Sequence, residues 1–287
     1  MQVQDAVQQF RDNGFLIIDG ALKADQIDRL TTALEELTDA GSNRIYNVAD
    51  ILGKHDAFLD LIDLPKVLPV IRALLGDNIW VNHSHYNVNP PDASVRHGAI
   101  KSGYGWHRDG GAINDDIAKP APLLSIKVAF YLSDLSEPGR GQTYVIKGSH
   151  ESGEKCPVND EMPKSAFPVC VSPGSALLFD RRMIHSIRSL NGSDVTRKAV
   201  FIQYAYRWLC AVDAMTVSGL EDKCDPVRKQ LLGLTPEYNV IDGAVGRSSR
   251  YYPTLHDLPL AGNRAPNPAS RMVRSLKRRI ARIAGAR

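Results

Sequence analysis

The chain lacks the cysteine pattern of a disulfide framework or of a structural zinc site. Its 287 residues contain four cysteines, and no two of them form a CxxC pair. A chain of this length can bury a sizeable hydrophobic core without covalent cross-links. We therefore expect Cys156, Cys170, Cys210 and Cys224 to be reduced thiols of a cytoplasmic protein.

The sequence also lacks long apolar runs and a large excess of either positive or negative residues over its whole length. No stretch approaches the roughly 18 apolar residues of a membrane span, and segment 1–15 lacks the apolar core of a signal peptide. The net charge is +3, but residues 271–287 carry seven Lys and Arg and no acid, which leaves about −4 (+3 less 7) for the rest. We expect no membrane span and no nucleic-acid partner.

The basic tail has its own pattern. Val273, Leu276, Ile280 and Ile283 recur at a spacing of three to four residues, with arginines around them. This spacing predicts a helix that either packs its apolar stripe on its own domain or meets an anionic membrane surface or an acidic partner.

Periodicity divides the remainder into a helical and a β-rich part. Apolar residues at helical spacing predict helices over 3–13, 23–40 and 64–77, and the apolar run 14–20 predicts a buried strand. Alternating patterns separated by turn residues predict further strands over 78–91, 121–135, 141–148, 166–180 and 195–208. Several short strands in succession favour an antiparallel sandwich or barrel.

No linker or internal repeat divides the chain. We predict one mainly β domain with helical additions over 1–265. It comprises a helical part over 1–77, a β core over about 78–208 and loops and helices over 209–265. The basic tail 266–287 is expected to be helical and loosely attached.

The segment "WHRDG" places His107 and Asp109 two residues apart. If it lies at the end of a strand, both side chains project to one face and Arg108 to the other. The pair then provides two of the three ligands of a 2-His-1-carboxylate iron site. Among the eight histidines, His185 is the best third ligand by context, since it lies between two predicted strands. Twelve residues later, Arg197 offers the bidentate cation that a carboxylate requires.

Four ordered blocks resemble the phytanoyl-CoA dioxygenase family of Fe(II)/2-oxoglutarate-dependent oxygenases. They are "FRDNGFLIIDGALKADQIDRL", "WHRDGG", "GRGQTYVIKGSH" and "PGSALLFDRRMIHS" with the arginine that follows. The resemblance implies a double-stranded β-helix, which is a cupin-like jelly roll. It also implies iron held by His107, Asp109 and His185, 2-oxoglutarate anchored by Arg197, and O2 as cosubstrate.

The blocks depart from the family pattern at two places. Arg140-Gly141 stands where relatives have Asn-Gly, and Lys147 stands where they have proline before Gly-Ser-His. Asp109 keeps the carboxylate that halogenating relatives lack, which disfavours halogenation. His150 closes the "KGSH" block, which we interpret as a structural turn rather than an iron ligand.

Further candidates surround these residues. Lys127 shares a strand face with Ser125, Ala129 and Tyr131, and it either pairs with a carboxylate of the cosubstrate or substrate or lies in solvent. Gln203 shares the face of Arg197, so it either contacts substrate or is satisfied by neighbours.

The segments around the iron motif add more candidates. Asn87 alternates with His83 and His85. Each of the three is either a hydrogen-bonded residue of the sheet or part of the pocket wall. Tyr104 and Trp106 either wall the pocket or pack in the barrel. The loop 110–122, with glycines at its start and prolines at its end, has the composition of a mobile lid.

The sequence thus predicts an enzyme that hydroxylates an unactivated C–H bond of a small metabolite or natural product, releasing succinate and CO2. Desaturation, cyclisation or epoxidation by the same chemistry is the first alternative. A cupin-like metalloenzyme without 2-oxoglutarate and a non-catalytic binding module are the others. We expect a monomer or homodimer.

Overall fold

The computed structural model describes residues 1–39, 43–92, 105–110, 117, 121–152, 155–157, 162–186, 191–234, 238–241, 244–248 and 255. Tyr104, most of the loop 110–122 and the basic tail 266–287 lie outside these residues. Predictions about them therefore remain predictions.

The expected N-terminal helices are present. They are α1 (Val3–Asn13), α2 (Ala24–Leu37) and α3 (Leu68–Leu75), with the short 3-10 helix η1 (Asp56–Leu61) between the last two. Helix α1 ends at Gly14, whose φ of 80° is a conformation that glycine adopts without strain. Helix α2 begins where the Gln26 side chain accepts a hydrogen bond from the backbone N–H of Lys23.

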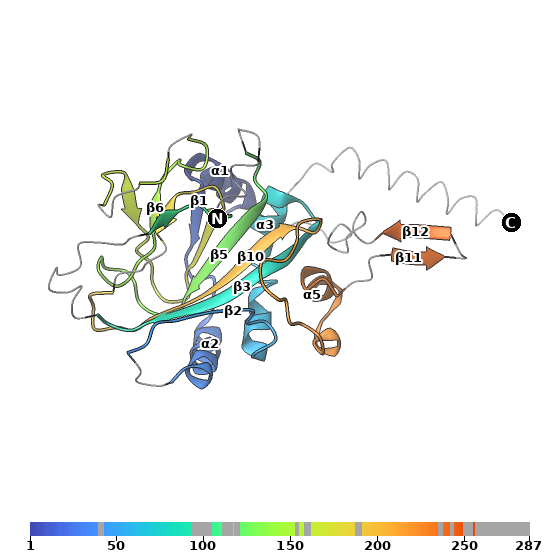
Figure 1. The fold of residues 1–287 in the computed structure, drawn as a ribbon, viewed down its shortest axis with the longest axis horizontal. Coiled ribbons are helices and arrows are strands. Elements are labelled where there is room, and N and C mark those ends of the chain that lie inside the picture. Colours follow the sequence, from blue (N-terminus) through green and yellow to red (C-terminus); the bar gives the residue numbers. More distant parts are fainter. Residues whose placement is uncertain are drawn as a thin grey trace.

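Six antiparallel strands form the larger sheet, in the order β1-β8-β5-β10-β3-β2. Figure 1 labels all of them except β8. They are β1 (Phe15–Ile18), β2 (Tyr46–Ala49), β3 (Ile79–Asn89), β5 (Ser125–Tyr131), β8 (Ala176–Asp180) and β10 (Arg197–Tyr206). No sequence pattern predicts β2, because four residues at a sheet edge are too few to establish an alternation.

A smaller antiparallel sheet has the order β4-β9-β6-β7. Its strands are β4 (Trp106–His107), β6 (Tyr144–Ile146), β7 (Ala166–Pro168) and β9 (His185–Ser186). The predicted strand 166–180 is wrong in one respect: it is two strands, β7 and β8, in different sheets. A turn at Gly174, with φ 84°, precedes β8 and redirects the chain.

The part after β10 contains η3 (Glu221–Lys223), α5 (Pro226–Leu231) and a hairpin of β11 (Tyr238–Ile241) and β12 (Ala244–Ser248). The two main sheets make the protein a jelly roll, and this confirms the predicted fold class. Among the described helices, none has the length and apolarity to cross a membrane. All four cysteines are free thiols.

The larger sheet has two buried faces. Its outer face packs against the N-terminal helices in one apolar cluster that includes Phe10, Leu34, Val128, Phe130 and Ile202. Its inner face packs toward the smaller sheet in a second cluster that includes Tyr131, Val145, Leu177, Phe179 and Phe201. The functional pocket opens on this inner face.

Candidate functional site

Two histidines and an aspartate converge where β4 pairs with β9. The register sets His107 directly opposite His185, and Asp109 follows two residues after His107. Their potential ligand atoms all lie within 4.8 Å of one another. Oδ1 of Asp109 is 3.7 Å from Nε2 of His107 and 3.8 Å from Nε2 of His185.

Backbone contacts orient these three side chains. Nδ1 of His107 lies 3.1 Å from the carbonyl oxygen of Gly105, and Nδ1 of His185 lies 3.0 Å from that of Met183. A carbonyl only accepts, so each Nδ1 carries a proton, and each Nε2 is the ring nitrogen that faces Asp109. The backbone N–H of Asp109 donates to the carbonyl of Arg181 at 3.0 Å, which fixes the turn after β4.

Arg108, between the two convergent residues, points elsewhere, as the strand spacing predicts. Its guanidinium donates to the carbonyls of Arg182, at 2.6 Å, and Ser149, at 3.0 Å. It thereby ties β4 to the chain that leads into β9 and to the turn after β6, so it stabilises the positions of His107 and Asp109.

The protonation states suit a divalent metal ion. Burial lowers the pKa of His185 to about 4, so its imidazole is neutral near pH 7. Burial alone would raise the pKa of Asp109, but Lys127, His107 and His185 hold that pKa well below its usual range. Two imidazole nitrogens and one carboxylate are the donor set that Fe(II) oxygenases use while leaving other coordination positions open. These residues therefore fit a resident Fe(II).

Arg197 is a buried cation at the start of β10, with 2% of its surface exposed. Its guanidinium donates to Oδ1 of Asn87 and lies over the Tyr131 ring at 5.6 Å. Within the described part of the chain, no carboxylate pairs with it and its Nε has no hydrogen-bond partner. Burial lowers the pKa of Arg197, yet an arginine remains charged. An uncompensated buried charge is costly, so this group fits an anionic ligand.

The glycine of the third block packs on that arginine. A Cβ at Gly141 would lie 3.0 Å from Cδ of Arg197, and the φ of Gly141 is 81°. Both the contact and the conformation favour glycine. The departure at Arg140 does not reach the pocket, because its guanidinium pairs with Asp134 and Glu137.

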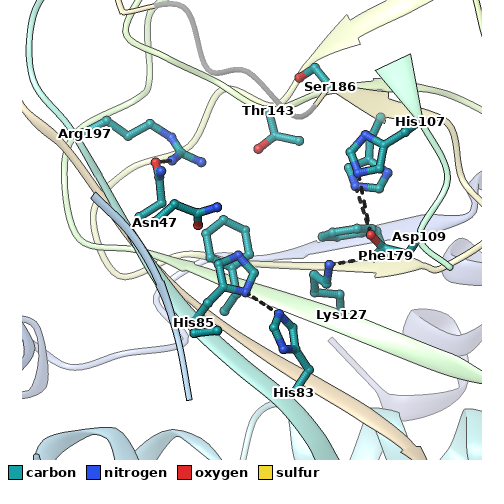
Figure 2. A pocket seen from close by; sticks show the side chains of 14 residues that line it. Asn47, His83, His85, His107, Asp109, Lys127, Thr143, Phe179, Ser186 and Arg197 are labelled. Atoms are coloured by element: carbon teal, nitrogen blue, oxygen red, sulfur yellow. Dashed lines mark hydrogen bonds and ion pairs between the residues drawn. The ribbon is translucent and has the colours of Figure 1, made fainter. Parts of the chain in front are cut away.

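One cavity of about 300 Å³ reaches from His107, Asp109 and His185 (the metal-ligand cluster) to Arg197. Figure 2 shows His107 and Asp109 on one side of it and Arg197 on the other, with His85 and Lys127 on its floor. The lining residues are Asn47, Ala49, His83, His85, Asn87, His107, Asp109, Lys127, Thr143, Phe179, His185, Ser186, Arg197 and Phe201.

The other predicted site residues divide between the pocket and its surroundings. Asn87 and Lys127 line the pocket, and Nζ of Lys127 lies 2.8 Å from Oδ2 of Asp109. Gln203 does not line it and donates instead to Oδ1 of Asn82 at 3.1 Å. Trp106 is 8% exposed and packs with Ile146 and Ile184. Tyr104 lies outside the described residues.

The "KGSH" block forms a turn that braces β9, as interpreted from the sequence. Oγ of Ser149 accepts a hydrogen bond from the N–H of Ile184 at 2.8 Å. Nε2 of His150 lies 2.9 Å from the carbonyl oxygen of Arg11, so the turn also holds the end of α1. His150 is therefore structural.

Several lining residues carry no clear signal in the sequence. Thr143 accepts a hydrogen bond from the Tyr131 hydroxyl at 2.9 Å, and Ser186 accepts one from the N–H of Tyr144 at 3.0 Å. Asn47 comes from the unpredicted edge strand β2. His83, His85 and Asn87, which the alternation in β3 marked as pocket candidates, all line the cavity.

The chain is similar to known dioxygenases along most of its length. It is 24% identical over 274 residues to dioxygenase af480 of Aspergillus fumigatus, covering 88% of this chain and 84% of that protein. HygX of Streptomyces hygroscopicus, crystallised with nickel, 2-oxoglutarate and hygromycin B, is 17% identical with a TM-score of 0.56. The match covers 74% of this chain and 92% of HygX.

A second solved structure has the same fold. The epimerase SnoN, in complex with Fe3+, alpha-ketoglutarate and nogalamycin RO, is 18% identical with a TM-score of 0.54. The match covers 71% of this chain and 83% of SnoN. The model of the phytanoyl-CoA dioxygenase family matches residues 10–199, which include every residue of the convergent cluster and Arg197. The chain therefore belongs to the phytanoyl-CoA dioxygenase family and is a dioxygenase that depends on Fe(II) and 2-oxoglutarate.

Proposed function

We propose that this enzyme hydroxylates an unactivated C–H bond of a small metabolite or natural product, with conversion of 2-oxoglutarate to succinate and CO2. One observation carries the proposal. A convergent pair of imidazoles with a carboxylate shares a cavity of about 300 Å³ with a buried arginine that has no carboxylate partner within the described part of the chain.

The metal would be held by His107, Asp109 and His185, whose Nε2 and Oδ1 atoms face one another. Fe(II) bound there with 2-oxoglutarate supplies the activation of O2 that attack on an unactivated C–H bond requires. The chain's own part is to leave the remaining coordination positions open and to bury the site between two sheets, which excludes water.

Arg197 would bind the carboxylate of 2-oxoglutarate that lies away from the metal, since its planar guanidinium can donate two parallel hydrogen bonds. Asn87 already orients that guanidinium through its Oδ1. Lys127 is proposed to add positive charge for a cosubstrate carboxylate beside the metal, because its ammonium reaches Asp109.

The proposed substrate is small and partly polar. The cavity wall mixes aromatic rings, from Phe179 and Phe201, with imidazole and amide groups. HygX and SnoN, which share this fold, were crystallised with hygromycin B and nogalamycin RO. The acidic balance of residues 1–270 disfavours a CoA thioester, whose phosphates require a basic groove. Desaturation, cyclisation or epoxidation remains the alternative outcome.

The cofactor roles are tested by adding Fe(II) and 2-oxoglutarate to the protein without oxygen. A weak visible charge-transfer band is expected, and its absence from folded protein would refute the assignment. Arg197→Ala should weaken 2-oxoglutarate binding far more than Fe(II) binding. Lys198→Ala is the matched control, because Lys198 is the next residue of β10 and pairs with Glu35 outside the pocket. Equal losses of both ligands in Arg197→Ala would contradict its role.

The reaction is tested by screening a metabolite extract for substrate-dependent succinate release. Succinate with a product heavier by one oxygen and carrying a new exchangeable O–H proton supports hydroxylation. One added oxygen without that proton supports epoxidation, and a product lighter by two hydrogens supports desaturation or cyclisation. Turnover without succinate would favour a cupin-like enzyme that does not use 2-oxoglutarate. Stoichiometric metal with neither turnover nor uncoupled succinate would favour a binding module.

A further inference from the structure

Three polar side chains in close contact reach the pocket at a point separate from His107, Asp109 and His185. Nδ1 of His85 lies 3.0 Å from Nε2 of His83, and Nδ1 of His83 lies 3.1 Å from Oδ2 of Asp213. The His85 ring also stacks on Phe201, with centroids 4.2 Å apart and planes 5° from parallel. In Figure 2 the His85 ring stands in the pocket, with His83 beneath it.

Asp213 is held as an ionised acceptor at the inner end of this group of side chains. Its side chain is 5% exposed, and it accepts hydrogen bonds from the N–H groups of Ser84, at 2.7 Å, and Met215, at 2.9 Å. Burial alone would raise the pKa of Asp213, but the adjacent His83 ring and the hydrogen bonds from these N–H groups lower it.

The segment that carries Asp213 is fastened to the strands beneath it. The N–H of Val212 donates to the carbonyl of Asn82 at 2.7 Å, and the N–H of Thr216 donates to Oδ1 of Asp50 at 2.8 Å. Met215 adopts a φ of 46°, which is unusual for a side chain other than glycine and persists only where the surroundings enforce it. The position of Asp213 is therefore fixed by the fold.

The fixed carboxylate sets where the first proton of His83 lies. A carboxylate only accepts, so the His83 Nδ1 that faces it at 3.1 Å carries a proton. When this is the only proton on the His83 ring, its Nε2 accepts from Nδ1–H of His85. The remaining nitrogen, Nε2 of His85, is then left with a lone pair, and no described residue donates a hydrogen bond to it.

The neutral state of His85 agrees with this arrangement. Burial first, and the nearby positive charge of Lys127 second, lower the pKa of His85 well below its usual value. An uncharged imidazole with one unprotonated nitrogen can accept a hydrogen bond but cannot donate one from that nitrogen.

We propose that His85 is a substrate-recognition residue that accepts a hydrogen bond from a hydroxyl or N–H group of the prime substrate, and that His83 and Asp213 position it. The inference rests on the proposed function, because it requires the cavity to bind the substrate beside the metal. 2-Oxoglutarate carries only acceptors near neutral pH, so it cannot satisfy this nitrogen. The substrate class is thereby narrowed to alcohols and to amines or amides with a free N–H.

The tautomer is tested by long-range ¹H–¹⁵N NMR of protein loaded with Zn(II), as a diamagnetic metal, and 2-oxoglutarate. The expected spectrum shows both His83 and His85 protonated at Nδ1 only. A proton on Nε2 of His85 would overturn the proposal without any variant having to fold. Asp213→Ala should give His85 a mixture of tautomers. Asp50→Asn, which perturbs the same segment without contacting His83, should leave the single tautomer, and a mixture there too would reduce Asp213 to a structural role.

Recognition is tested with matched probes, cyclohexanol and methoxycyclohexane, which differ by capping of the hydroxyl. A hydrogen bond of about 1 kcal/mol corresponds to roughly fivefold tighter binding of cyclohexanol, together with a shift of the His85 Nε2 resonance. His85→Phe should remove that preference but keep the anaerobic charge-transfer band. Equal binding of the two probes, or a preference that survives in His85→Phe, would overturn this inference. A band missing from the unaltered protein would instead overturn the proposed function.

Discussion

The two faces of β10 are buried to a similar extent but carry different chemistry. On the outer face, Val200, Ile202 and Tyr204 are 0% exposed and pack against the helical layer. On the inner face, Arg197 is 2% and Phe201 is 9% exposed, and both line the pocket. Burial of apolar groups stabilises the fold, whereas burial of a cation destabilises it until an anion binds. The comparison assigns stability to one face and ligand binding to the other.

The largest effect is expected from a cavity on the outer face. Phe130 of β5 is fully buried beside Val200, and Phe130→Ala should lower the free energy of unfolding by about 3–5 kcal/mol. Urea denaturation measures this loss. The fraction that remains folded should bind 2-oxoglutarate normally. A comparable loss of 2-oxoglutarate affinity would contradict the assignment of stability to the outer face and ligand binding to the inner face.

The next effect concerns the metal-ligand cluster alone. His185→Ala should lower Fe(II) affinity by at least about 100-fold. Loss of a residue that only hydrogen-bonds to a metal ligand already lowers metal affinity by about 10- to 100-fold, and loss of a ligand itself should cost no less. The free energy of unfolding of the metal-free protein should change far less than in Phe130→Ala. Anaerobic Fe(II) titration provides the measurement. His55→Ala is the control, since His55 lies outside the pocket and caps η1, and it should bind Fe(II) as the unaltered protein does.

A conservative change on the inner face tests whether Arg197 binds 2-oxoglutarate through its charge alone or through its planar guanidinium. Arg197→Lys keeps a positive charge but loses the planar fork that binds a carboxylate through two hydrogen bonds. One charge-assisted hydrogen bond contributes about 1.5–3 kcal/mol, so 2-oxoglutarate should bind ~10- to 100-fold more weakly. Isothermal titration with Zn(II)-loaded protein measures this affinity. Unchanged affinity would show that charge alone suffices.

The smallest effect is expected at Gly141. Gly141→Ala strains a backbone with φ 81° and brings a Cβ to 3.0 Å from Cδ of Arg197, so 2-oxoglutarate affinity should fall several-fold, about 1 kcal/mol. Gly139→Ala is the matched control, because Gly139 has φ 90° but no atom within 4 Å of its added Cβ. Both variants should lose similar stability. A similar loss of affinity in both would assign the effect to backbone strain rather than to Arg197.

The fold was largely predictable because its elements have strong local signals. The α1 boundaries follow from a 3–4 spacing that ends at Gly14, and β10 follows from a long alternation of apolar residues. The edge strand β2 and the division of 166–180 between two sheets were missed. Pairing partners, rather than local pattern, determine a four-residue strand or the sheet to which a strand belongs.

The candidate site was predictable only where residue types are rare and their spacing is informative. His107, Asp109, His185 and Arg197 were named from the sequence, and the structure brings all four to one cavity. Trp106 and Gln203 were named as well, but they lie in packed surroundings outside the cavity lining. A strand pattern gives two faces without indicating which one meets a ligand.

The sequence by itself determined the class of the fold and the family, and it named the donor set of the proposed metal site. Rare residue types in four ordered blocks carry that information without coordinates. Only the tertiary structure decided that His85 presents an acceptor to the pocket. That proposal depends on Asp213 behind His83. Asp213 is 128 residues away from His85 along the chain and lies close to β3 only because the segment after β10 folds back onto it.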